Sequence, residues 1–145
     1  MLIRLLPDQI ARHWPGYIKE SVRASMPTHA ERSDAAMNNV LGALLASQAQ
    51  CWVIRVDKKV RGVVTTFISV DAISKTRNLL LYSLLIDNPT PGIFRDIRDT
   101  LLAFAKGEGC SHGYAYVHYP EMIDIAEKLG ASCQTIISFS TNVKN

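Results

Sequence analysis

Several features that would assign a chain to a class at once are missing from this 145-residue sequence. Lysine and arginine never gather into a basic run, and no apolar stretch approaches the roughly 20 residues that span a bilayer. The first residues lack the basic region and the long apolar block of a secretory signal peptide. Sixteen basic and thirteen acidic residues give a net charge of +3 spread along the chain, with no footprint of nucleic-acid or membrane binding. We therefore expect a cytoplasmic protein that binds neither.

Cysteine is scarce, and catalytic signatures are absent. Cys51, Cys110 and Cys133 are far apart and lack C-x-x-C or paired histidine spacing, which argues against a disulfide framework and against a metal site. No Gly-x-Ser-x-Gly motif is present, so hydrolase chemistry is disfavoured. Without linkers or repeats, and with 48% hydrophobic residues, the sequence predicts a single domain over residues 1–145.

Hydrophobic periodicity predicts the elements of the first third of the chain. Residues 2–6 are expected to form a short strand that Pro7 stops. Apolar residues then recur at three- and four-residue spacing over 9–24, which predicts a helix, although Pro15 inside it is expected to kink or restart it. A second helix is expected over 33–47.

The period then changes to that of strands. Residues 51–56 and 60–70 are rich in Val, Ile and Thr and flank a tight turn, so they predict a β-hairpin. Gly62 near the start of the second strand predicts a bulge or a close approach of main chains. With residues 79–86 as a third strand, these segments form an antiparallel meander.

The segment 79–86 is the strongest strand signal in the chain. Its near-continuous apolar run predicts a central strand buried on both faces. Thr90 is placed to cap a helix and Pro91 to begin it, with the helix continuing to about Lys106. A strand that leads directly into a helix N-terminus makes a natural anion site, because the free N–H groups and the helix dipole point outward there.

The remaining elements complete an α/β (α+β) fold. A strand is expected over 114–119, a short helix over 120–129 and a closing strand over 133–140. The expected architecture is a mixed central sheet, built on the antiparallel meander and flanked by helices.

This order of elements, with a late short helix that ends Ala126-Glu127-Lys128-Leu129-Gly130-Ala131, resembles the GNAT (GCN5-related N-acetyltransferase) superfamily. The resemblance covers essentially the whole chain. Residues 37–39, 50–52, 62–66 and 77–80 also resemble small GNAT-type proteins encoded by tailed bacteriophages.

The resemblance implies transfer of an acetyl group from acetyl-CoA to an amine, with the pantetheine arm held against the strand at 81–86, whose edge has to splay from the strand at 114–117. The family's glycine-rich diphosphate loop falls at 87–94, where this chain has a single glycine and two prolines, Pro89 and Pro91, that carry no N–H. Arg95 and Arg98 are the expected charge partners of the phosphates. The residues expected to bind the cofactor are Leu84, Leu85, Ile86, Gly92, Ile93 and Phe94, the last three through their main-chain N–H groups at the phosphates.

Catalytic residues are harder to carry over from the family. Ala126 stands where many members have a general-acid tyrosine, and no carboxylate lies within 79–86. The substitutes near the end of the late strand are Tyr116, His118 and Tyr119. Other available groups are Glu121, Asp71, Asp87 and His112.

Two functions stay open at this stage. One is an active N-acetyltransferase, acting on a small-molecule or protein amine in the host cytoplasm. The other is a catalytically inactive structural or assembly component of a phage virion, in the head–tail or tail region, with other virion proteins as its partners. In a symmetric assembly the cofactor cleft would be filled by a neighbouring chain or by Phe94, Tyr116 and Tyr119, with interfaces above about 1,000 Å².

Overall fold

The computed structural model describes residues 1–117 and 120–142 and contains one mixed five-stranded sheet. The spatial order follows the chain, and each pair is antiparallel except the last, in which β5 runs parallel to β4. This architecture confirms the expected fold class. The strands are β1 (Leu2–Arg4), β2 (Ala49–Val56), β3 (Lys59–Val70), β4 (Arg77–Ile86) and β5 (His112–Ala115).

The apolar strand β4 is not the central one. It lies between β3 and β5, and β3 occupies the middle of the sheet. Its burial is also less complete than predicted, since Leu79 and Ser83 are buried whereas Leu85 is 40% exposed. An apolar run predicts burial on both faces only where helices cover both faces along its whole length, and the β4 end near Leu85 is not covered in this way.

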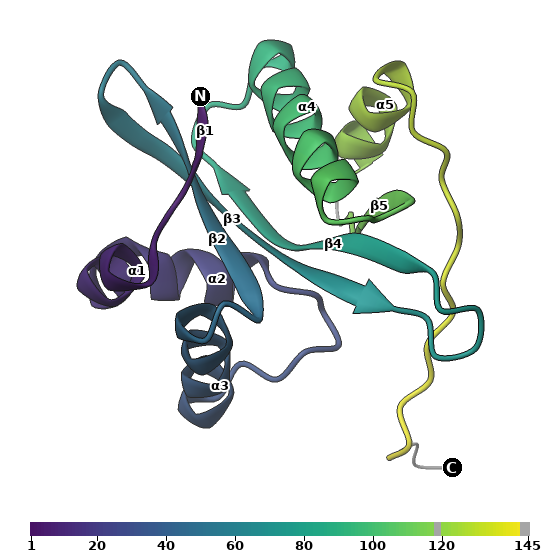
Figure 1. Cartoon of the computed structure of the whole chain (residues 1–145), viewed down its shortest axis with the longest axis horizontal. Helices are drawn as coiled ribbons and strands as arrows, with labels where there is room; N and C mark the ends of the chain where they lie inside the picture. Colours follow the sequence, from purple (N-terminus) through teal and green to yellow (C-terminus); the bar gives the residue numbers. More distant parts are fainter. Residues whose placement is uncertain (118–119, 143–145) are drawn as a thin grey trace.

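Helices pack on both faces of the sheet, as Figure 1 shows. Each face has its own buried core, because the sheet separates the two sets of side chains. The first core includes Ile10, Ile18 and Met37, and the second includes Ile97 and Leu101. One face carries α1 (Pro7–His13), the π-helix η1 (Trp14–Ile18), α2 (Lys19–Ser25) and α3 (Asp34–Leu45), and the other carries α4 (Pro91–Gly107) and α5 (Pro120–Lys128).

The helix predicted over 9–24 forms as three consecutive segments. Pro15 has no N–H to donate, and the chain passes it in a π-turn in which the Lys19 N–H bonds to the Trp14 oxygen. Trp14 and Ile18 still reach the core. The expected interruption at Pro15 therefore occurs without loss of the buried face.

In α4, Phe94, Ile97, Leu101 and Ala105 recur at three- and four-residue spacing and form the buried stripe. The apolar spacing of this helix also predicts Leu102 inward, which is wrong, because Leu102 lies next to the stripe rather than on it and is 48% exposed.

Gly62 has both of its predicted roles. Ile54 pairs with Gly62 and Arg55 with Val60, so Arg61 is an extra residue and forms a bulge. A Cβ atom on Gly62 would lie 2.6 Å from the Leu85 oxygen, which is far closer than van der Waals contact. The absence of a side chain lets β3 approach the end of β4.

The predicted closing strand over 133–140 is wrong. This segment is extended but pairs with no strand within the described residues, and Ile136, Ile137 and Phe139 are 70%, 77% and 85% exposed. Strand-like composition gives only a propensity, whereas a strand also needs a neighbour that is long enough to pair with it, and β5 has four residues. Figure 1 shows the segment running down the outside of the domain after α5.

Among the helices of residues 1–117 and 120–142, none is both long and apolar enough to cross a bilayer.

Candidate active site

The parallel strands β4 and β5 pair only briefly. Their register begins at Asn78 with His112 and ends at Leu81 with Ala115. Beyond that point β4 continues to Ile86 along β3 alone. The main-chain groups of Tyr82–Ile86 that point toward the β5 side therefore lack a strand partner within the described residues, and we call this segment the open edge of β4.

A β-bulge lies at the start of the open edge. Thr65 pairs with Ser83 and Thr66 with Leu81, which leaves Tyr82 as an extra residue on β4. Ser83 shares a buried hydrogen bond with Thr65 through their hydroxyl groups. Tyr82 packs against the core on the α1–α3 face, so the bulge presents two consecutive polar side chains, Tyr82 and Ser83, to that face.

The N-terminus of α4 comes directly after the open edge. The Thr90 hydroxyl caps the helix by accepting the Ile93 N–H at 3.2 Å, and the Thr90 carbonyl accepts the Phe94 N–H at 3.2 Å. Pro91 has no N–H, so within the described structure Gly92 carries the first-turn amide that has no acceptor. Of the three amides predicted to contact phosphate, one is free.

The cationic side chains near the N-terminus of α4 differ in whether they are free to contact an anion. Arg98 donates to the Asp99 carboxylate at 2.8 Å and to the Leu129 carbonyl at 2.9 Å, which ties α4 to the end of α5. Arg95 is exposed. The Arg61 carbonyl accepts the Asp87 N–H at 2.7 Å, which places the Arg61 main chain beside the end of β4. Arg95 and Arg61 are therefore the better candidates to contact an anion here.

The predicted cofactor residues divide into two groups. Gly92 is exposed at the helix N-terminus, and Leu85 is exposed on the open edge. Leu84, Ile86 and Ile93 pack with the core beneath α4, and Phe94 is buried within it at 9% exposure. Phe94 is thus a core residue rather than a side chain that fills a cleft.

Of the predicted catalytic residues, Tyr116 is described, whereas His118 and Tyr119 lie outside the described residues. Tyr116 follows the end of β5 and makes an edge-on contact with His29, with ring centroids 5.6 Å apart. His29 belongs to the α2–α3 loop. No pattern in the sequence indicates this contact, because it joins two loops that are distant in the chain.

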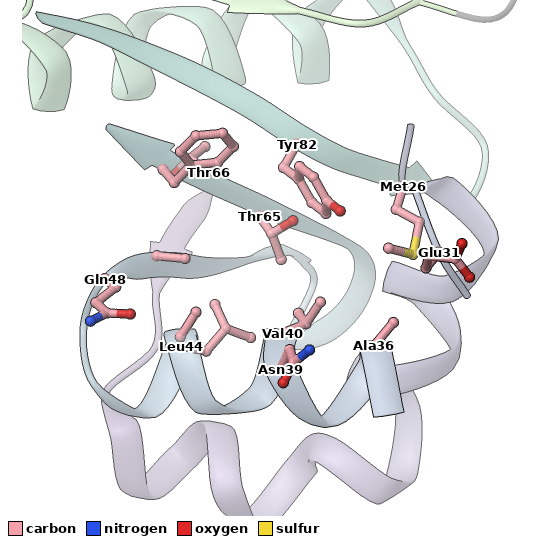
Figure 2. A pocket seen from close by; sticks show the side chains of 13 residues that line it. Met26, Glu31, Ala36, Asn39, Val40, Leu44, Gln48, Thr65, Thr66 and Tyr82 are labelled. Carbon is pink, nitrogen blue, oxygen red and sulfur yellow. The ribbon is translucent and has the colours of Figure 1, made fainter. Parts of the chain in front are cut away.

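A cavity of about 450 Å³ lies between α3 and the sheet, as shown in Figure 2. Tyr82 lines it at the point where β4 and β5 separate, and stacks edge-on against Phe67 at 5.9 Å. Burial raises the pKa of Tyr82, an effect partly offset by Arg32, so the phenol remains protonated near neutral pH and can donate a hydrogen bond. The other lining residues are Met26, Glu31, Ala36, Asn39, Val40, Ala43, Leu44, Gln48, Ala49, Thr65 and Thr66.

One arginine organises the loop at the mouth of this cavity. Arg32 donates to the carbonyl oxygens of Met26 at 2.7 Å and Ala30 at 3.1 Å, and also to those of Pro27 and Arg23. These hydrogen bonds fix the path of the α2–α3 loop, which carries Glu31 to the cavity and His29 to Tyr116. Within the described part of the chain, no three His, Cys, Asp or Glu side chains are placed to hold a metal ion.

Comparison with solved structures identifies the fold. The chain is similar to an aminoglycoside acetyltransferase, meta-AAC0020, from an uncultured soil metagenomic sample, in complex with sisomicin, with a TM-score of 0.73, 13% identity, and coverage of 99% of this chain and 96% of the other. It is similar to AAC(6')-Iy in complex with a bisubstrate analog, CoA-S-monomethyl-acetylneamine, with a TM-score of 0.72, 14% identity, and coverage of 99% and 98%. Glucosamine-6-phosphate N-acetyltransferase from Arabidopsis thaliana gives 0.67, 12%, and coverage of 99% and 98%.

No protein-family model matches the chain, and no curated protein matches it by sequence. The likeness to the solved structures shows that the chain has the fold of these N-acetyltransferases. Identities of 12–14% show a shared fold, and a shared fold does not by itself establish an activity.

Proposed function

We propose that this protein transfers an acetyl group from acetyl-CoA to an amine. The observation that carries the proposal is the open edge of β4, Tyr82–Ile86, which leads into the capped N-terminus of α4. The two amide groups of a pantetheine arm can pair with a free strand edge as an added strand does. The diphosphate then falls at the helix N-terminus, where the Gly92 N–H and the helix dipole favour an anion.

The reaction needs few catalytic side chains. The lone pair of a neutral amine attacks the thioester carbonyl carbon, so a C–N bond forms, the C–S bond breaks, and the proton lost by nitrogen neutralises the departing CoA thiolate or passes to water. A main-chain N–H of the open edge is available to hydrogen-bond the oxyanion, and fixed orientation lowers the barrier further. Catalysis by a main-chain hydrogen bond and by orientation is consistent with a strand that has no carboxylate and with a late helix that has Ala126 in place of a tyrosine. Tyr116 and His29, which are in contact just beyond β5, are a pair of side chains able to carry a proton.

Cofactor affinity is expected to be modest, because one first-turn amide is free where a glycine-rich loop would offer several. Replacing Gly92 by valine puts a branched side chain where the phosphate would approach, so CoA binding should be lost. Space is available for the side chain itself, since a Cβ at Gly92 meets only the Thr90 hydroxyl, at 3.9 Å. The matched control is Gly107→Val at the opposite end of α4, where a Cβ meets nothing within 4 Å.

A thermal shift in the presence of CoA tests the proposal. A ligand at a hundred times its Kd stabilises the native state by about 2.7 kcal/mol, which raises Tm by several degrees in a chain of this length. We expect this shift at millimolar CoA in the wild type and in Gly107→Val, and its loss in Gly92→Val. No shift in the wild type would refute the proposal, and an unchanged shift in Gly92→Val would show that the anion site lies elsewhere.

A non-catalytic role in a phage virion is the second candidate. Pro89 and Pro91 each withhold an N–H from the expected diphosphate site, and the exposed apolar side chains of Ile136, Ile137 and Phe139 offer a surface for another protein. Light scattering after size-exclusion chromatography, combined with a CoA assay, distinguishes the virion component from the enzyme. A symmetric oligomer that does not bind CoA would favour assembly, and a monomer that consumes acetyl-CoA would favour the enzyme.

A further inference from the structure

The cavity beneath the Tyr82 bulge, bounded by α3 and the sheet, has a lining with a definite chemical character. Its walls are mostly aliphatic and aromatic, and Glu31 is the one charged side chain among the residues that line it. The neighbouring Arg32 guanidinium also acts on Tyr82, but its N–H groups are hydrogen-bonded to main-chain carbonyls at the α2–α3 loop. Building on the proposed function, we propose that the acceptor is a monoamine with an apolar body, an arylalkylamine or alkylamine, bound in this cavity with its nitrogen at the Glu31 end.

The position of the charge sets the orientation. In Figure 2, Glu31 and Met26 lie at one end of the cavity and Gln48 at the other, with Val40 and Leu44 between them. An amine that enters with its nitrogen near Glu31 leaves its carbon body against the apolar stretch of α3. Glu31 is solvent-exposed, so it can receive an ammonium group from water without first losing its own hydration.

The end of the cavity that carries Glu31 is also the end where the proposed acetyl transfer takes place. Tyr82 lines the cavity one residue beyond Leu81, which is the last β4 residue paired with β5. The thioester in the proposed function lies along the open edge that begins at Tyr82. An amine near Glu31 and Tyr82 is therefore placed beside the strand separation through which the acetyl carbon must be reached. The protonated Tyr82 phenol can hydrogen-bond the neutral amine once its proton is lost.

Hydrogen bonds within the chain define the course of the α2–α3 loop. The hydrogen bonds of Arg32 to Met26, Ala30 and neighbouring carbonyls hold the main chain on both sides of Glu31. A loop held in this way loses little conformational entropy when a ligand binds, so a small ligand with a single charge can still bind specifically.

The same lining argues against polycationic acceptors. An amine with several ammonium groups needs several carboxylates or open water, and buried unpaired charges are costly. The aminoglycoside acetyltransferase structure that resembles this chain was solved with sisomicin, so the shared fold alone would suggest such substrates. The cavity lining points to a different class, and a volume of about 450 Å³ suits a ligand with one aromatic ring or a short alkyl chain.

Direct binding to the free protein tests this inference separately from catalysis. Titration calorimetry is run with 4-phenylbutylamine, with 4-phenylbutanol as the uncharged analogue and with sisomicin as the polycation. We expect binding of the amine, binding of the alcohol weaker by about tenfold, because the alcohol cannot pair with Glu31, and no measurable binding of sisomicin.

Two pairs of variants complete the test. Glu31→Gln should weaken phenylbutylamine binding by about tenfold and leave phenylbutanol binding unchanged, whereas Glu108→Gln, exposed at the end of α4, should change neither. Ala43→Leu narrows the cavity and should weaken both ligands, whereas Ala35→Leu, exposed on the same helix, should not. If Ala43→Leu fails to fold, the comparison of Glu31→Gln with Glu108→Gln tests the inference by itself.

The outcomes separate this inference from the function on which it rests. Tighter binding of sisomicin than of phenylbutylamine, or phenylbutylamine binding that is unchanged in Glu31→Gln, would overturn the assignment of the acceptor class even if acetyl-CoA is consumed. Phenylbutylamine binding that depends on Glu31 in a protein that never binds CoA would overturn the transferase instead. Acetylation of phenylbutylamine that falls in Glu31→Gln, with CoA affinity unchanged, would support both.

Discussion

Replacing Gly62 by alanine should destabilise the protein through the strand that carries the open edge. The new Cβ would lie 2.6 Å from the Leu85 oxygen, 2.9 Å from the Ile54 Cδ1 atom and 3.2 Å from the Ile86 Cα atom. The first and third contacts are with main chain, so relief requires β4 to move away from β3. That movement strains the Asp87 to Arg61 hydrogen bond, which closes this end of the β3–β4 pair.

The size of the effect follows from these contacts. Overpacking that shifts main chain costs about 1–3 kcal/mol, and loss of one hydrogen bond adds about 1 kcal/mol. With a urea m-value of about 2 kcal/mol/M, the combined loss of about 2–4 kcal/mol lowers the midpoint by about 1–2 M. Because the displaced residues belong to the open edge, CoA affinity should fall as well.

Urea unfolding followed by circular dichroism measures the change. The matched control is Gly42→Ala, which lies in α3 with nothing within 4 Å of a new Cβ. Alanine there should stabilise the protein by roughly 0.5–1 kcal/mol, because glycine is unfavourable in a helix. A Gly62→Ala protein as stable as the wild type would refute the close approach of β3 to β4.

Three further predictions concern the helix cap, a buried thiol and the cavity loop. Thr90→Ala should cost about 1 kcal/mol in urea unfolding and weaken CoA binding, whereas Thr90→Ser, which keeps the hydroxyl that accepts the Ile93 N–H, should change little. Burial raises the pKa of Cys51 from 9.0 to about 12, so its contribution to stability is intact below pH 9 and is lost as the pH rises from there toward 12. Mass spectrometry of native protein labelled with a maleimide should find Cys51 unmodified until the chain unfolds, and labelling at the rate of an exposed thiol would contradict its burial. Arg32→Ala should free the α2–α3 loop and weaken phenylbutylamine binding with CoA affinity unchanged, and equal loss of both would point to general unfolding instead.

Features set by local chemistry could be predicted from the sequence. Thr90 and Pro91 specify a capped helix start, and that helix begins at Pro91. Gly62 marked a bulge and a close approach, and both are present. These signals work because each depends on one residue's own geometry or on its immediate neighbours.

Features set by distant partners could not be predicted in the same way. The bulge at Tyr82 depends on how β4 aligns with Thr65 and Thr66, and no pattern within β4 reveals it. The segment 133–140 has the composition of a strand but has no partner in the described sheet. Glu31 reaches the cavity on a loop held by hydrogen bonds from Arg32, and periodicity does not reveal the course of that loop.

The number of donors at the anion site shows a third kind of limit. The sequence indicated that Pro89 and Pro91 lack N–H groups and left Gly92, Ile93 and Phe94 as donors. The structure shows that the Thr90 cap uses two of those three. The same cap that starts the helix therefore competes with a ligand for its amides, which is a property of the folded helix end rather than of any single residue.

The most direct test of the central claim is to follow backbone amide chemical shifts by NMR while CoA is added. We expect the largest changes on Tyr82–Ile86 and on Gly92, because the pantetheine arm pairs with the open edge and the diphosphate meets the free helix amide. Shifts that are confined to other surfaces, or no shifts at millimolar CoA, would contradict the claim that this fold holds acetyl-CoA at the end of β4.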